Sequence, residues 1–132
     1  MKRAVNACLL LAVTVAGCAV LHGAVLARTE RLGQGIGRLL QLCETAAPAA
    51  LAEETRALVR SSAPTLRLLH CAAGHETVDA LAQRLQTLPY LAADRAAYRA
   101  QCADALVLLG SLRQAQRVSL ENILFFHVFT VS

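Results

Sequence analysis

This sequence of 132 residues contains no Trp, only three Phe and two Tyr, and a single Lys. β-Sandwiches are rich in aromatic and β-branched strands separated by frequent turn residues, so the few aromatics and only seven Gly argue against that class. Charged residues make up 17% and hydrophobic residues 56%, which excludes a disordered chain. Alanine and leucine dominate, and both favour helices. The composition therefore predicts one small all-α domain.

Motifs that would indicate catalysis or phosphate binding are also lacking. There is no GxSxG motif, and the run Gly33-Gln34-Gly35-Ile36-Gly37 follows no strand and lacks the P-loop lysine. We therefore predict a binding protein without a cofactor rather than an enzyme. Residues 28–132 hold eleven Arg and nine acidic residues, a net charge of +2 that is too dispersed for a nucleic-acid-binding face. Arg56, Arg60 and Arg67 are a candidate basic patch for an acidic partner.

His70, Cys71, His75 and Glu76 form the only dense group of potential metal ligands. Zinc sites need about four ligands at characteristic spacings, and neither a CxxC pair nor an HExxH helix is present. His70 and His75 are five residues apart, which is not the four-residue spacing that aligns two ligands on one helix. We therefore expect ordinary surface histidines and predict no metal site.

The first 27 residues are typical of a secretory signal. Lys2 and Arg3 precede an uncharged run from Ala4 to Ala27, and Val25-Leu26-Ala27 suits cleavage after Ala27. We predict a signal segment over 1–27 and a secreted helical domain over 28–132.

Two alternatives compete with cleavage after Ala27. The apolar stretch is long enough to span a bilayer as an uncleaved anchor of an interaction protein. Val15-Ala16-Gly17-Cys18 resembles a bacterial lipobox, in which Cys18 would be lipidated to give an envelope lipoprotein that acts as a helical adaptor. A lipoprotein usually continues with a polar tether, whereas the residues after Cys18 stay apolar as far as Ala27.

Apolar residues recur at helical spacing along the rest of the chain. A stripe over 32–43 predicts the first helix, which Ala46-Ala47-Pro48 ends. A second helix is predicted from about Ala49 to Arg60, with a stop at Ser61-Ser62-Ala63-Pro64 because proline breaks helices.

The remaining helices are delimited by capping residues, glycine and proline. Thr65 is predicted to cap a short continuation that ends at Gly74. Thr77 is predicted to cap the next helix, which Pro89 closes. A long helix then runs from about Ala92 to Arg117.

Residues 118–132 differ in composition from everything before them. They contain all three Phe and no Ala, Arg, Gly or Pro. Ser119 is a candidate cap for a short helix, although the run over 123–131 has the highest β-propensity of the chain. A final core helix or strand is one interpretation, and translation past an exon end is the other.

Five cysteines are present, of which Cys8 and Cys18 lie in the apolar leader. Cys43, Cys71 and Cys102 follow it, and export would place them in an oxidising compartment where disulfides persist. They permit one bridge and leave one thiol, and any pairing would join separate helices and contribute ~3–4 kcal/mol. The alternative is that all three are small buried apolar side chains.

By layout the chain resembles the short-chain four-helix cytokines, and within them the interleukin-4/interleukin-13 family. Cys43 follows the first helix, Leu69-His70-Cys71-Ala72-Ala73 resembles the cysteine-bearing second helix, and Ser119-Leu120-Glu121-Asn122-Ile123-Leu124 resembles the start of the last. The resemblance implies an up-up-down-down bundle with two long crossovers. It also implies a secreted monomer with growth-factor activity that binds a cell-surface receptor in the immune response.

Overall fold

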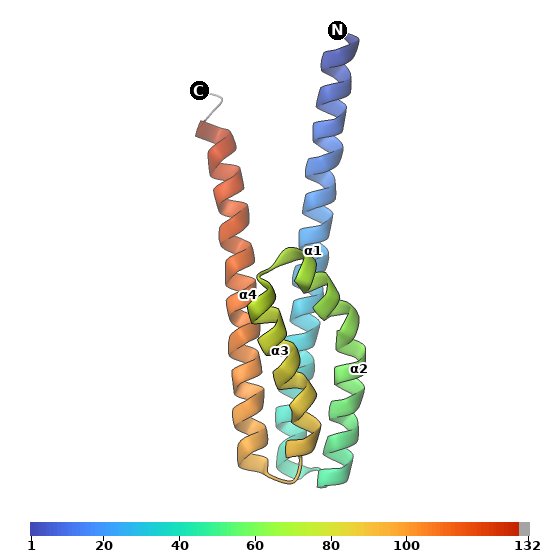
Figure 1. Ribbon diagram of the computed structural model, residues 1–132, viewed down its shortest axis with the longest axis vertical. Helices are drawn as coiled ribbons and strands as arrows, with labels where there is room; N and C mark the ends of the chain where they lie inside the picture. The colour runs from blue at the N-terminus through green and yellow to red at the C-terminus, as the bar shows by residue number, and fades with distance from the viewer. Residues whose placement is uncertain (130–132) are drawn as a thin grey trace.

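The computed structural model describes the backbone of residues 1–129 and the side chains of residues 1–117. Its elements, in chain order, are α1 (Lys2–Thr45), α2 (Pro48–Ala72), α3 (His75–Thr87), the 3-10 helix η1 (Leu88–Leu91) and α4 (Arg95–Phe129). The described residues contain no strand, and the four α-helices pack side by side (Figure 1). The predicted all-α four-helix bundle is therefore confirmed.

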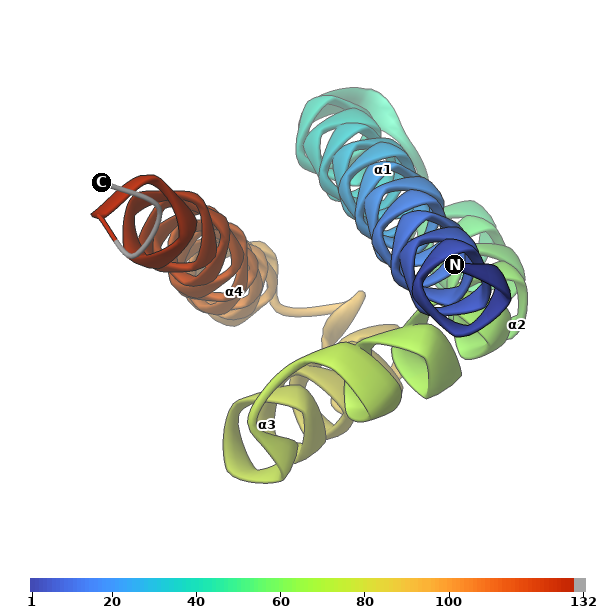
Figure 2. The same cartoon turned by 90° about the horizontal axis from the view of Figure 1, so that it is seen from above.

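The order of helix directions differs from the predicted one. Only Ala46 and Ala47 separate α1 from α2, and only Ala73 and Gly74 separate α2 from α3. Links this short make neighbouring helices antiparallel, so the bundle runs up-down-up-down (Figure 1). Seen from above, α1 lies diagonally opposite α3, and α2 opposite α4 (Figure 2). The up-up-down-down order is wrong because no connection between described helices is long enough to form a crossover.

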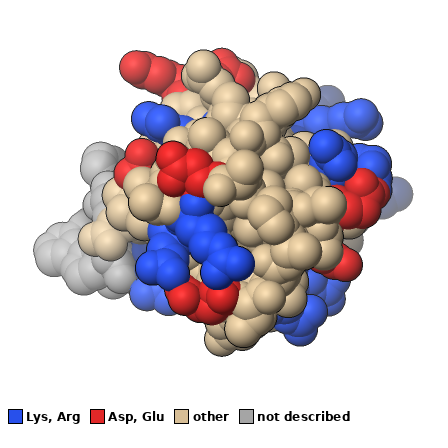
Figure 3. Space-filling view, turned by 90° about the horizontal axis from the view of Figure 1, so that it is seen from below, with Lys and Arg blue, Asp and Glu red and all other residues tan. Residues whose placement is uncertain are grey.

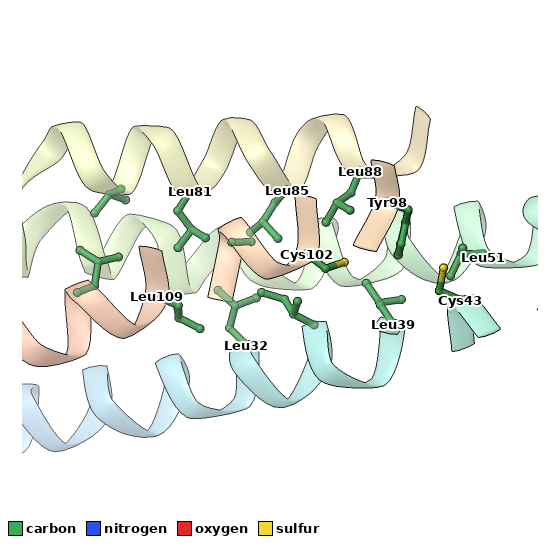
Figure 4. Packing of buried hydrophobic residues seen from close by; sticks show 14 of the residues in the cluster. Leu32, Leu39, Cys43, Leu51, Leu81, Leu85, Leu88, Tyr98, Cys102 and Leu109 are labelled. Atoms are coloured by element: carbon green, nitrogen blue, oxygen red, sulfur yellow. The ribbon is translucent and has the colours of Figure 1, made fainter. Parts of the chain in front are cut away.

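One apolar stripe from each helix forms the core (Figure 4). The stripe predicted over 32–43 is confirmed, since its members on α1 are almost completely buried. The same holds for the stripes of α3 and α4. The buried residues of these three stripes are Leu32, Ile36, Leu39, Cys43, Val78, Leu81, Leu85, Tyr98, Cys102, Ala105, Leu109 and Leu112.

The predicted stop at Pro64 is wrong, because α2 continues through this residue to Ala72. Proline has no N–H to donate to the carbonyl four residues earlier, which removes one hydrogen bond of the helix. Hydroxyls beside it donate to neighbouring carbonyls, Ser61 to that of Leu58 (2.9 Å) and Ser62 to that of Val59 (2.8 Å). Burial of Ser62 and Leu69 on either side holds the segment against the bundle. Beyond Pro64, α2 leans over the top of the bundle (Figure 1).

Two predicted capping residues lie elsewhere. Thr65 is buried inside α2, and Thr77 lies inside α3, whose N-cap is Gly74. The start of α4 is capped by Asp94, whose carboxylate accepts hydrogen bonds from the backbone N–H groups of Ala96 (3.1 Å) and Ala97 (3.0 Å). Sequence reasoning placed α4 within three residues of its observed start but did not identify this cap.

Helix α1 passes without a break through Ala27 and projects from the bundle at one end (Figure 1). None of the residues before Val25 is buried, and Val25 is the first residue of the core. Among the described residues α1 is the one helix long and apolar enough to cross a membrane, a test that signal sequences also meet.

The backbone of α4 continues as helix through residues 118–129, and it leaves the bundle at the same end as the start of α1 (Figure 1). Of the helix and the strand considered for this segment, the described backbone forms a helix and not a strand. Ser119 lies inside α4 and does not begin a new helix.

Charged side chains are interspersed on the lower end of the bundle rather than sorted by sign (Figure 3). Ion pairs connect neighbouring helices: Arg99 with Glu44 at 2.6 Å, and Arg113 with Glu30. The Arg95 guanidinium donates to the carbonyls of Glu44 (2.8 Å) and Ala46 (3.3 Å), which caps the C-terminus of α1. These contacts connect α1 and α4 at the surface of the bundle, where exposed ion pairs contribute little to stability.

Candidate binding cleft

An open cleft lies where α1 leaves the bundle, between α1, the α2–α3 turn and α4. Two thiols and three imidazoles line it, among small and apolar groups. Its lining residues are Cys18, Leu21, His22, Val25, His70, Cys71, Ala72, Ala73, Gly74, His75, Ala115 and Gln116. Three of the chain's four histidines therefore gather at one place, although they lie on three different helices.

The α2–α3 turn that forms one wall follows from two local features. The backbone of Ala73 is extended, with φ of −138° and ψ of 174°, and Gly74 begins the next helix. The Gln116 amide of α4 donates to the carbonyl of Ala72 at 3.3 Å, which satisfies one of the carbonyls that a helix end leaves without a partner. The turn is thus fixed from within and from α4.

His70 and His75 face each other across this turn. Their rings stack with centroids 5.6 Å apart and planes inclined by 25°, and their Nδ1 atoms are 3.3 Å apart. On the far side of the His70 ring, Nε2 lies 3.4 Å from Oδ1 of Asp79, one turn further along α3. A carboxylate, an imidazole and a second imidazole therefore form a line on the surface of the cleft.

The thiols that the sequence singled out occupy two separate places. Cys18 and Cys71 are exposed and line the cleft. Cys43 and Cys102 are completely buried near the opposite end of the core, together with Tyr98 (Figure 4). All five cysteines are free, so the structure contains no bridge among them. A disulfide stays a prediction, and the structure places Cys71 at the other end of the bundle from Cys43 and Cys102.

Burial controls the chemistry of Cys102 and Tyr98 inside the core. It raises the pKa of the Cys102 thiol to about 12, and the neighbouring Cys43 adds to the rise. Burial also raises the pKa of Tyr98 to about 12, and its hydroxyl lies 2.6 Å from that of Thr55. Because the thiolate is the reactive form of cysteine, this shift disfavours the reactive form of Cys102 at neutral pH.

The predicted basic patch is partly neutralised. Arg56 and Arg60 both pair with Glu53, at 3.2 and 3.4 Å, and hydrogen bonds from the two guanidinium groups lower the pKa of that carboxyl. Arg67 is exposed about two helical turns beyond Arg60 on α2. An open groove beside Arg56 and Arg60 is also lined by Tyr90, whose side chain is exposed.

Sequence reasoning missed the cleft because its residues come from distant parts of the chain. It gave His22, Asp79 and Gln116 no role. Gly74, which lies between His70 and His75, is the sequence feature that could have revealed the histidine pair. It separates two helices, so the five-residue spacing does not belong to a single helix. The described residues contain no set of three or more His, Cys, Asp or Glu side chains already placed to share a metal ion.

No family model, curated protein or solved structure matches this chain. The arguments for function therefore rest on the geometry described above.

Proposed function

We propose that the chain is a membrane-anchored binding protein, whose N-terminal helix spans a bilayer and whose bundle presents the cleft at the outer surface. The observation that carries this proposal is the burial of Val25 and Thr29. Thr29 is only 1% exposed, and its hydroxyl donates to the carbonyl of Val25 at 2.7 Å. The apolar helix and the bundle core therefore share residues.

Cleavage after Ala27 would damage this core. It would remove Val25, which is 2% exposed, and it would take away the acceptor of the buried Thr29 hydroxyl. The buried Val25 side chain would also lose its place in the core, and loss of buried apolar area destabilises a fold. A chain that keeps α1 intact avoids this loss, which supports an uncleaved anchor over a cleaved signal.

The dimensions of α1 suit a spanning role. The 18 residues from Ala4 to Leu21 carry no charge, and at 1.5 Å per residue they measure about 27 Å, close to the ~30 Å hydrocarbon core of a bilayer. His22 and most of the cleft then lie at the interface with the headgroups, while Cys18 and Leu21 of the cleft lining belong to the spanning segment. Lys2 and Arg3 ahead of the apolar run are the pattern that exports the residues behind it.

The C-terminal end of α4 supports the same placement. Residues 118–129 leave the bundle on the side from which α1 projects (Figure 1). In sequence this segment is apolar over Ile123-Leu124-Phe125-Phe126, a composition that suits a membrane. Twelve helical residues measure about 18 Å, so this segment reaches into one leaflet only.

Expression of the full chain in a bacterial host tests the anchor, because such a host contains both the signal peptidase and the lipoprotein-processing enzymes. We expect the protein in the membrane fraction after a carbonate wash, with an intact mass that includes residues 1–27. A soluble product that begins at Arg28 would refute the anchor and favour the secreted, receptor-binding ligand that the cytokine resemblance implies.

A pair of variants separates the anchor from the lipoprotein. Cys18→Ser should leave membrane retention unchanged, because a spanning helix needs no lipid. Leu10→Lys with Leu11→Lys should move the protein out of the membrane fraction, because charges at the centre of a span oppose insertion. If Cys18→Ser releases the protein and the native chain carries lipid on Cys18, the chain is a lipoprotein instead.

A further inference from the structure

We propose that His70 and His75 form a binding site for a late first-row transition-metal ion, with Zn²⁺ as its representative. The proposal rests on the imidazole geometry at the α2–α3 turn and does not depend on the membrane anchor. His70 is the third residue from the end of α2, and His75 is the first residue of α3. The turn between them places one ring over the other.

The separation of the two ring nitrogens matches a chelate. Two nitrogens bound to one tetrahedral zinc at about 2.0–2.1 Å lie about 3.3–3.4 Å from each other. The Nδ1 atoms of His70 and His75 are 3.3 Å apart. In the metal-free chain this contact is a hydrogen bond between the two rings, with one Nδ1–H as donor. Because the rings are stacked, a bound ion would replace that hydrogen bond and require the rings to rotate about their soft terminal torsions until both Nδ1 lone pairs face it.

Asp79 supplies the outer partner that metal-binding histidines usually have. Its carboxylate lies 3.4 Å from Nε2 of His70, the nitrogen that points away from His75. A carboxylate in this position accepts a hydrogen bond from Nε2, orients the ring and leaves Nδ1 available as a ligand. This outer contact distinguishes the pair from two histidines that merely stack.

The cleft explains which metals fit. Cys18, His22 and Cys71 line the same cleft, and no carboxylate is among its lining residues. Imidazole and thiolate groups suit zinc, copper and nickel, whereas magnesium and calcium require oxygen ligands. Two protein ligands leave further positions for water or for a group of the cleft, so the site is open.

Zinc titration of the full chain in detergent micelles, against a chromophoric chelator under reducing conditions, tests the proposal. We expect saturable binding of one Zn²⁺ per chain that a large excess of Mg²⁺ does not displace. His70→Ala and His75→Ala should each weaken binding at least tenfold, and the double variant should abolish it. Absence of saturable binding, or equal affinity in the double variant, would overturn the site.

A matched pair of carboxylate variants tests the outer contact. Asp79→Asn should weaken zinc binding roughly tenfold or more, in line with losses on removal of such partners. Glu76→Gln removes the same charge from an exposed residue next to His75 and should leave the affinity unchanged. Equal effects of the two variants would mean that only general surface charge attracts the ion, which contradicts the proposal.

Thermal unfolding provides a readout independent of the chelator. Because His70 and His75 belong to different helices, zinc bound to both stabilises the turn, and a ligand that binds only the folded state raises Tm. Both histidines are at least partly exposed, so the variants should retain the fold and the Tm of the metal-free protein. A zinc-dependent rise in Tm that persists in the double variant would place the ion elsewhere.

Discussion

Buried hydroxyls in this bundle are satisfied by the backbone or by one another. The Thr55 hydroxyl lies 2.6 Å from the carbonyl of Leu51 and 2.6 Å from the hydroxyl of Tyr98, which joins α2 to α4 inside the core. Tyr98 is completely buried, and the described residues contain no buried side-chain nitrogen or oxygen without a partner. This contact is specific because the surrounding core is apolar.

Replacement of the tyrosine hydroxyl measures that contact. Tyr98→Phe should lower the free energy of unfolding by about 0.5–1.5 kcal/mol, the usual contribution of one hydrogen bond. Chemical denaturation measures the change, and Thr55→Val with the double variant completes a cycle. Fully additive single effects would show that the two hydroxyls do not interact.

Alkaline pH should destabilise the protein through the same region. The pKa of Cys102 rises from its ordinary value of about 9 to about 12 on folding, so between these values the unfolded chain loses a proton that the folded chain keeps. Stability is therefore fully present below pH 9 and falls as pH rises towards 12, and Tyr98 acts in the same direction above pH 10.

Denaturation at a series of pH values measures this slope. Between pH 9 and 11 the free energy of unfolding should fall less steeply in Cys102→Ala than in the native chain, because the variant lacks the thiol proton of Cys102. An identical slope in both proteins would contradict the assignment. Cys71→Ala is the matched control, since Cys71 is exposed and its removal should not alter the slope.

At the scale of the element, glycines let α1 approach its neighbours. A Cβ on Gly35 would come within 2.5 Å of the Leu58 side chain on α2, and one on Gly33 would lie 3.3 Å from Leu109 on α4. A Cβ on Gly37 would meet nothing within 4 Å. The close approach therefore occurs at Gly33 and Gly35, and the Gly33/Gly37 spacing visible in the sequence has no packing role as a pair.

Alanine substitutions separate helix propensity from packing. Gly37→Ala should raise the free energy of unfolding by about 0.5–1 kcal/mol, because alanine favours the helix and no neighbour is displaced. Gly35→Ala gains the same propensity but forces Leu58 to move, so it should be clearly less stable than Gly37→Ala. Thermal and denaturant unfolding of both variants measure the difference, and equal stabilities would show that Leu58 adjusts freely.

The helices could be predicted from periodicity, but some of their ends could not. Apolar stripes such as 32–43 allowed the helices to be predicted, because burial of one helix face repeats at the helical period. The helix end predicted at Pro64 was wrong because the effect of a proline depends on whether tertiary packing compensates for the lost hydrogen bond. For the cleft, the sequence showed the cluster around His70 but not the contact with His75 or Asp79. That contact depends on the angle between two helices, which the turn at Gly74 determines.

For the whole molecule, the order of helix directions is determined by the lengths of the links between the helices rather than by the helices themselves. A resemblance in layout suggested crossovers, whereas two-residue links such as Ala46–Ala47 allow only antiparallel neighbours. The link lengths were visible in the sequence only once the helix ends were known. Extension of α2 beyond Pro64 used up the residues that a crossover would have needed.

The absence of a break in α1 has a mechanical consequence. Each residue of a helix advances it by 1.5 Å and turns it by 100°. The projecting part and the bundled part belong to one helix of 44 residues. A rotation of the projecting part about the helix axis therefore also rotates the bundled part. One alanine inserted between Gly17 and Cys18 would turn the bundle by about 100° relative to the anchor, and the cleft would then open towards a different neighbour.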